Sequence, residues 1–184
     1  DYKKTMELQD IASDNNISRQ QSRPYWFQSK LEMTAKSQDT KQFKGPWLVS
    51  EYVFNEDGSF AGIVKQRRYL KVNESQKDIY DLTQICMPDP SLKNHPMSDF
   101  IGERFTQIRI DGAERHYIGP EVLGKGIAYG DEAVLGKGRW PIFGHDFESF
   151  GVIPEINLQL TGGKFFKEDK MVANITGIAT PEYS

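Results

Sequence analysis

The distribution of glycine constrains the fold of this chain more than any other feature. All 16 glycines lie from Gly45 onward, and residues 1–44 contain none. At the same point the apolar residues change to a period of two, beginning with the aromatic and β-branched run Trp47–Phe54, which is typical of a strand. The sequence therefore divides into an N-terminal arm, residues 1–44, and a β domain, residues 45–184.

The arm is predicted to combine short helices with extended chain. Phe27, Leu31 and Ala35 recur at a spacing of four after Pro24, which predicts one apolar stripe on a helix. Aromatic side chains of the arm are candidate anchors for a partner protein or for the wall of the β domain. They are Tyr25, Trp26, Phe27 and Phe43.

After Gly45, short strand-like runs follow one another with only turns between them, giving about eight to ten strands. Asp111-Gly112 is the clearest hairpin signal. No helix-length insert separates the runs, which excludes parallel βαβ units. Because open sheet edges are a liability, we predict a mainly β fold in which an antiparallel up-and-down sheet closes into a barrel.

The entry to the first strand carries a short motif, Gly45-Pro46-Trp47. It resembles the Gly-x-Trp signature of lipocalins and the wider calycin group. The resemblance implies that Trp47 packs across one end of the barrel beside Gly45. It also implies that the interior holds a small apolar ligand.

A five-residue sequence occurs twice, as Val122–Gly126 and as Val134–Gly138. The first copy nearly completes a phosphate-binding loop, but Gly126 replaces the Ser/Thr that would hold Mg²⁺, and no helix follows. We therefore reject nucleotide binding and predict two strand–turn units, each ending in a flexible Gly-Lys-Gly with a solvated lysine. Gly162-Gly163 predicts a further tight turn.

Polar and aromatic residues on the predicted strands are candidates for a ligand site. Neighbouring strand residues face opposite sides, so only one of Arg67 and Arg68 can point inward. An inward arginine needs an anionic partner, which a ligand carboxylate, Glu51 or Asp81 would supply. The candidate ligand-binding residues are Tyr52, Arg67, Tyr80, Arg109, Arg115, His116, Trp140, Phe147 and Phe150.

The sequence supports neither a metal centre nor a nucleophilic active site. His95, His116 and His145 share no metal-ligand spacing. The chain has no Gly-x-Ser-x-Gly elbow, and its single cysteine, Cys86, lies in an apolar run and is expected to be a small buried hydrophobe. No catalytic residue is assigned, and the cofactor is left unknown.

Charge and hydropathy exclude two further classes of partner. A net charge of −3 argues against a protein held mainly by nucleic-acid phosphates. The chain lacks a run of about 18 uncharged apolar residues, so no membrane-spanning helix is predicted. Because the chain begins at Asp1, we expect it to be processed, and a secreted or organellar location fits; the compartment itself is left open.

The sequence leaves three functional hypotheses open. The first is non-catalytic binding of a small hydrophobic molecule, such as a pigment or a lipid, inside the barrel. The second is an accessory or scaffold subunit that docks onto a larger protein assembly through residues 1–44. The third is a small barrel enzyme of the cyclase or isomerase type, in which tyrosine, arginine or histidine side chains steer proton transfer.

Overall fold

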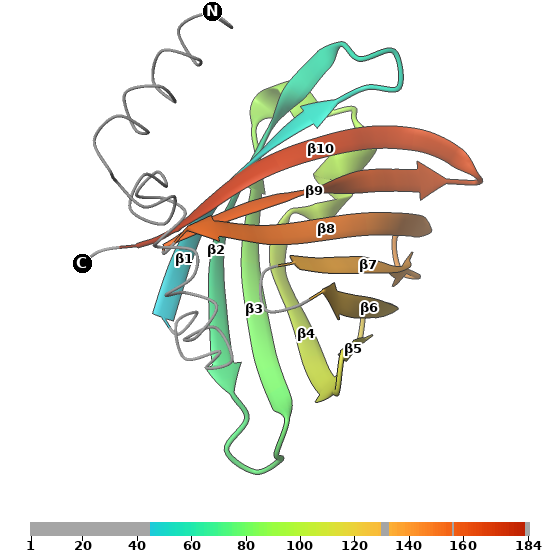
Figure 1. Ribbon diagram of the computed structural model, residues 1–184. Coiled ribbons are helices and arrows are strands. Elements are labelled where there is room, and N and C mark those ends of the chain that lie inside the picture. The colour runs from blue at the N-terminus through green and yellow to red at the C-terminus, as the bar shows by residue number, and fades with distance from the viewer. Residues whose placement is uncertain (1–44, 130–132, 156, 183–184) are drawn as a thin grey trace, which may run out of the picture.

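Ten antiparallel strands form a closed barrel in a computed structural model that describes residues 45–129, 133–155 and 157–182 (Figure 1). The predicted arm, with Tyr25, Trp26, Phe27 and Phe43, lies outside the described residues. The strands are β1 (Gly45–Phe54), β2 (Phe60–Val72), β3 (Ile79–Pro88), β4 (Gly102–Asp111), β5 (Glu114–Ile118), β6 (Leu123–Tyr129), β7 (Ala133–Trp140), β8 (His145–Glu155), β9 (Leu158–Lys167) and β10 (Lys170–Pro181).

Each strand pairs with its neighbours in the sequence, and β1 also pairs with β10. Trp47 lies opposite Pro181 and Phe54 lies opposite Asn174, so the first and last strands are joined along nearly their whole length. This closure confirms the prediction of a mainly β, antiparallel up-and-down barrel.

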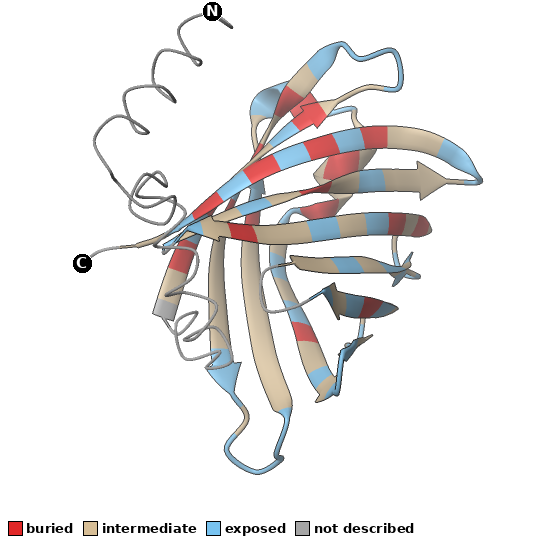
Figure 2. Cartoon of the chain, viewed as in Figure 1, coloured by how far each residue is buried: buried red, intermediate tan, exposed pale blue. Residues whose placement is uncertain are grey.

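The strands alternate between the inside and the outside of the barrel, and β10 shows this most clearly (Figure 2). Ala173, Ile175 and Ala179 are buried, whereas the intervening Asn174 and Ile178 are exposed. Alternation follows from the period-two geometry of a strand whose one face meets the core.

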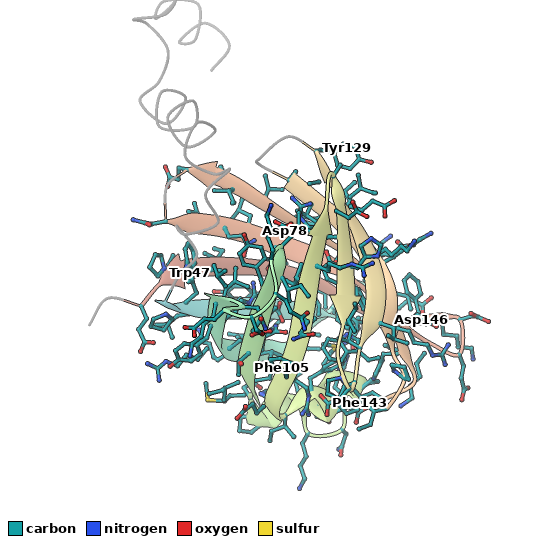
Figure 3. All side chains as sticks on the ribbon, turned by 90° about the horizontal axis from the view of Figure 1, so that it is seen from below. Trp47, Asp78, Phe105, Tyr129, Phe143 and Asp146 are labelled. Carbon is teal, nitrogen blue, oxygen red and sulfur yellow. The ribbon has the colours of Figure 1, made fainter. Side chains whose placement is uncertain are left out.

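Trp47 packs near one end of the barrel in a small buried cluster with Val49 and Ala179. Its side chain is 5% exposed. It lies away from Phe143, which packs against the opposite end (Figure 3).

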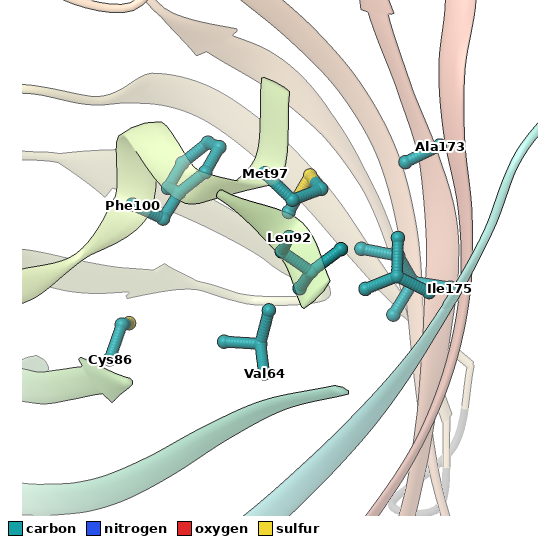
Figure 4. Packing of buried hydrophobic residues seen from close by; sticks show 8 residues of the cluster. Val64, Cys86, Leu92, Met97, Phe100, Ala173 and Ile175 are labelled. Carbon is teal, nitrogen blue, oxygen red and sulfur yellow. The ribbon is translucent and has the colours of Figure 1, made fainter. Parts of the chain in front are cut away.

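The opposite end is closed by two short 3-10 helices in the β3–β4 connection, η2 (Pro90–Leu92) and η3 (Pro96–Phe100). We call this connection the cap. Its buried side chains, Leu92, Met97 and Phe100, pack on the inner faces of β1, β2, β3 and β10 (Figure 4). In the described ranges no helix has the length and apolar character needed to span a membrane.

Asp89 fastens the cap to the barrel wall. Its Oδ1 accepts a hydrogen bond from the Ser91 backbone N–H at 2.8 Å, which caps η2. Its Oδ2 accepts one from the Ile63 N–H of β2 at 2.8 Å. One carboxylate therefore accepts hydrogen bonds from the cap and from β2 and links the two.

The predicted Gly-Lys-Gly turns are wrong, because both Gly-Lys-Gly sequences lie inside strands. Gly124 of β6 pairs with Gly138 of β7, and Gly126 pairs with Gly136. A Cβ added at Gly124 would lie 2.7 Å from the Lys137 carbonyl oxygen, so glycine is required here by close packing rather than by a turn.

The turn predicted at Gly162-Gly163 is also wrong, because both glycines lie within β9. A Cβ at Gly162 would meet the ring of Phe150 at 2.5 Å, and one at Gly163 would collide with the Glu148 carbonyl oxygen. Neighbouring groups fill the space that side chains would otherwise take.

Leu92→Ala is expected to lower the free energy of unfolding by about 3 kcal/mol, because it deletes a fully buried side chain and leaves a cavity in the cap. Urea denaturation followed by tryptophan fluorescence measures the change. Ile101→Ala, at a side chain that is 66% exposed beside the cap, is the matched control. It should change stability by less than about 0.5 kcal/mol. Equal losses in the two variants would contradict a packed cap.

Candidate functional site

The barrel encloses a cavity of about 400 Å³. Aromatic and aliphatic side chains make up most of its wall. Among them are Trp47, Leu70, Tyr80, Trp140, Phe147 and Phe165. A volume of this order falls in the range of small-molecule sites, roughly 300 to 1,000 Å³.

Tyr117 lies against a wall without side chains, formed by the glycines of β6 and β7. A Cβ at Gly124 would be 3.2 Å from the Tyr117 ring, and one at Gly126 would collide with the Tyr117 hydroxyl. Burial raises the pKa of this hydroxyl, partly offset by Arg115. The inner glycines therefore make room for a tyrosine that lines the cavity.

A chain of polar side chains crosses the apolar wall. Gln66 donates to Glu51 Oε2 at 2.6 Å, and Gln84 donates to Gln66 Oε1 at 2.9 Å. Arg68 Nη1 donates to Gln159 Oε1 at 3.2 Å, and Arg68 Nη2 donates weakly to Gln66 Oε1 at 3.4 Å. The network joins β1, β2, β3 and β9 and positions Arg68 and Glu51 at the cavity.

Arg68 and Glu51 are half-buried charges on the cavity wall, and they do not touch. Burial raises the pKa of Glu51, and the nearby Arg68 and the hydrogen bond from Gln66 oppose that shift. Burial lowers the pKa of Arg68, with Glu51 opposing. In the described residues the two groups form no ion pair within 4 Å, and Arg68 Nε has no hydrogen-bond partner. The hydrogen bonds of Arg68 therefore go only to neutral amide oxygens.

Five of the nine predicted ligand-binding residues line the cavity. Arg115 also donates to the Gly112 and Glu114 carbonyl oxygens, which places it at the β4–β5 turn, away from the cap. Phe150 is 40% exposed and lines an outer groove as well. The five are Tyr80, Arg115, Trp140, Phe147 and Phe150.

The other four lie outside the cavity lining. Tyr52 is 37% exposed and Arg109 is also exposed. Arg67 pairs with Glu182 at 2.6 Å, and His116 Nε2 lies 3.0 Å from Glu114 Oε2. Ligand contact by any of the nine stays a prediction, since no ligand is bound.

The inward arginine of β2 is Arg68, not Arg67. The alternation rule allows one of the two to point inward, and the register of β2 selects Arg68, because Val64 and Gln66 are buried four and two residues earlier. Arg67, the predicted candidate, therefore lies on the outer face, where it pairs with Glu182. The run Val64, Gln66, Arg68, Leu70 is the sequence signal for the inner face.

The three histidines have separate partners. His95 Nδ1 accepts from the Met97 N–H at the start of η3. His145 is fully buried, with Nε2 3.2 Å from Asp99 Oδ2. Among the residues that the structure describes, no three His, Cys, Asp or Glu side chains gather at a geometry suited to a metal ion.

No family model and no curated protein sequence matches the chain. Among solved structures, a protein of unknown function from the DUF3598 family of Nostoc punctiforme aligns with a TM-score of 0.57 and 11% identity. The alignment covers 77% of this chain and 48% of that protein, so the chain spans about half of its length.

An S-type phycobiliprotein lyase from Guillardia theta also aligns, with a TM-score of 0.57 and 8% identity. Here the alignment covers 85% of this chain and 94% of the lyase. At such low identities the likeness establishes a shared β-barrel fold.

The thiol of Cys86 is expected to be unreactive in the folded protein. It is 5% exposed, and burial, reinforced by Glu51, raises its pKa to about 12. A raised pKa keeps the thiol protonated at pH 8, and the thiolate is the reactive form. We expect negligible labelling by a disulfide reagent at pH 8 in buffer and complete labelling in denaturant. Rapid labelling of the native protein would contradict this burial.

Proposed function

We propose that the protein binds a small apolar molecule carrying an acid group inside its barrel, without changing it chemically. The observation that carries this proposal is Arg68, a half-buried arginine on the wall of an aromatic cavity that makes no direct contact with an anion. A charge partly withdrawn from water is costly unless an opposite charge contacts it, and Glu51 lies nearby without touching Arg68. An acidic ligand in direct contact would therefore stabilise the guanidinium.

The lining favours a flat or elongated apolar body. Trp47, Tyr80, Tyr117 and Trp140 present aromatic surfaces to the cavity, and such surfaces favour stacked contacts with other π-systems. Pigments and fatty acids of modest size both combine an apolar body with a carboxylate.

The barrel is proposed to belong to the calycin group. The support is the Gly45-Pro46-Trp47 motif at the start of β1, the buried Trp47 near one barrel end, and the closed up-and-down topology. The fold shared with a phycobiliprotein lyase is the reason to include linear tetrapyrroles beside fatty acids in a ligand screen.

Arg68→Gln is expected to weaken binding of acidic ligands by about 10- to 100-fold, because a hydrogen bond to a charged group contributes roughly 1.5 to 3 kcal/mol. Arg67→Gln, the adjacent residue on the outer face, is the matched control and should leave affinity unchanged. Quenching of tryptophan fluorescence measures the affinity for palmitic acid and biliverdin, since Trp47 and Trp140 line the cavity.

Comparing each acid with its methyl ester separates the two parts of the proposal. The two parts are binding of an apolar body in the cavity and recognition of the acid group by Arg68. Both are supported if the acid binds more tightly than its ester in the wild-type protein and this difference disappears in Arg68→Gln. Equal binding of acid and ester would leave a cavity for apolar ligands but contradict the role of Arg68. Native mass spectrometry of the purified protein provides a second test. If it detects neither a retained small molecule nor a complex with any added member of this panel, ligand binding is contradicted for these classes.

A further inference from the structure

The repeated Gly-Lys-Gly sequences place a row of charged residues on the outer wall of the barrel. Lys125 of β6 pairs with Lys137 of β7, Lys137 pairs with Glu148 of β8, and Glu148 pairs with Lys164 of β9. Asn174 of β10 continues the row. We call these five exposed residues the cationic row. In the part of the chain that the structure describes, its lysines form no ion pair within 4 Å.

A second row runs beside the first, two residues along each strand. Ile127 pairs with Leu135, and Leu135 pairs with Phe150. These three side chains, the apolar row, are 40%, 51% and 40% exposed. Phe150 packs over Gly162 of β9, so its ring is held in place while one side stays open. Fixed, exposed aromatic side chains are frequent anchors in protein interfaces.

The two rows line one groove of about 600 Å³ on the outer wall. It lies on the outer side of the wall whose inner side lines the cavity, with Ser149, Phe150 and Gly163 bordering both, and it differs from the cavity in its charge. The chain as a whole carries a net charge of −3, whereas this row holds three lysines against one glutamate. A locally positive, partly apolar groove on an acidic protein is complementary to an acidic amphipathic partner.

The dimensions of the rows match a helix laid across the strands. The three lysines lie on the four neighbouring strands β6–β9, which at about 4.8 Å apart span about 14 Å, the length of about 10 helical residues. The rows lie two residues apart on each strand, about 7 Å, so one helix can present apolar and acidic stripes to them together. A second copy of this chain fits less well, because it would set three lysines against three.

We propose that this outer groove docks an acidic amphipathic helix of a partner protein. The apolar stripe of the helix packs on Ile127, Leu135 and Phe150. Its carboxylates pair with Lys125, Lys137 and Lys164. The groove thus gives the Gly-Lys-Gly repeats a role on each face of the wall: glycines face the tyrosine inside and lysines face the partner outside.

The test uses the full chain and an 18-residue fluorescent peptide, with leucines at helical spacing flanked by glutamates. Fluorescence anisotropy should show saturable binding that weakens as salt rises, because exposed ion pairs are screened. A peptide with lysines in place of the glutamates should bind about tenfold more weakly.

Variants locate the binding to the groove. Lys137→Glu should weaken the acidic peptide by about fivefold or more, since it replaces attraction by repulsion. Lys71→Glu, at an exposed lysine of β2 outside the groove, is the matched control and should have little effect. Leu135→Asp should abolish binding. Arg68→Gln should leave it intact, which separates this site from the internal cavity.

Three results would overturn the proposal. The first is absence of saturable binding of the acidic peptide. The second is an equal effect of Lys137→Glu and Lys71→Glu. The third is preferential binding to vesicles containing one quarter anionic phosphatidylglycerol, lost in Lys137→Glu, without peptide binding; this would assign the groove to a lipid surface instead.

Discussion

The pairing of β1 with β10 is the constraint on which the rest of the structure depends. Each of the other pairs joins strands that follow one another along the chain. Only this pair connects residues far apart in sequence, such as Val49 and Ala179, and both of these side chains are buried beside Trp47. Without it the sheet would have two free edges, which invite association with other chains. With it the strands surround an interior cavity, and Arg68 lies on the wall of that cavity.

The interior is a compromise between packing and space. At the cap, Leu92, Met97 and Phe100 fill the barrel as an ordinary core. Farther from the cap, glycines on β6 and β7 have no side chain at positions where a filled barrel would have one, and Tyr117 occupies part of that space. The polar network through Gln66 satisfies most donors but leaves Arg68 without an anion in contact. Incomplete satisfaction of this kind is costly for folding alone, which is why the proposed ligand site is built on Arg68.

Much of the fold could be predicted from the sequence, because strand periodicity and turn chemistry are local. Asp111-Gly112 gave the β4–β5 hairpin, and the absence of helix-length inserts gave the antiparallel barrel. The Gly-Lys-Gly of β7 was predicted to be a turn because two glycines so close together are typical of one. The contact that explains these glycines comes from Tyr117, on another strand. The candidate site could be predicted only in part. Alternation along β2 shows that only one of two neighbouring arginines can point inward, but identifying it as Arg68 needs the register of the whole strand. The hydrogen bond from Arg68 to Gln159 could not be predicted either, because Gln159 lies on β9, far away in the sequence.

The barrel wall at β6 and β7 is one layer of backbone thick. The residues on its inner face and those on its outer face are therefore subject to different constraints. As the sequence drifts over evolutionary time, a change at Gly124 or Gly126 would disturb the packing inside. A change at the intervening Lys125 would leave that packing untouched. Persistence of the lysines in diverged relatives would then record selection from outside the barrel, whereas persistence of the glycines would record only its architecture.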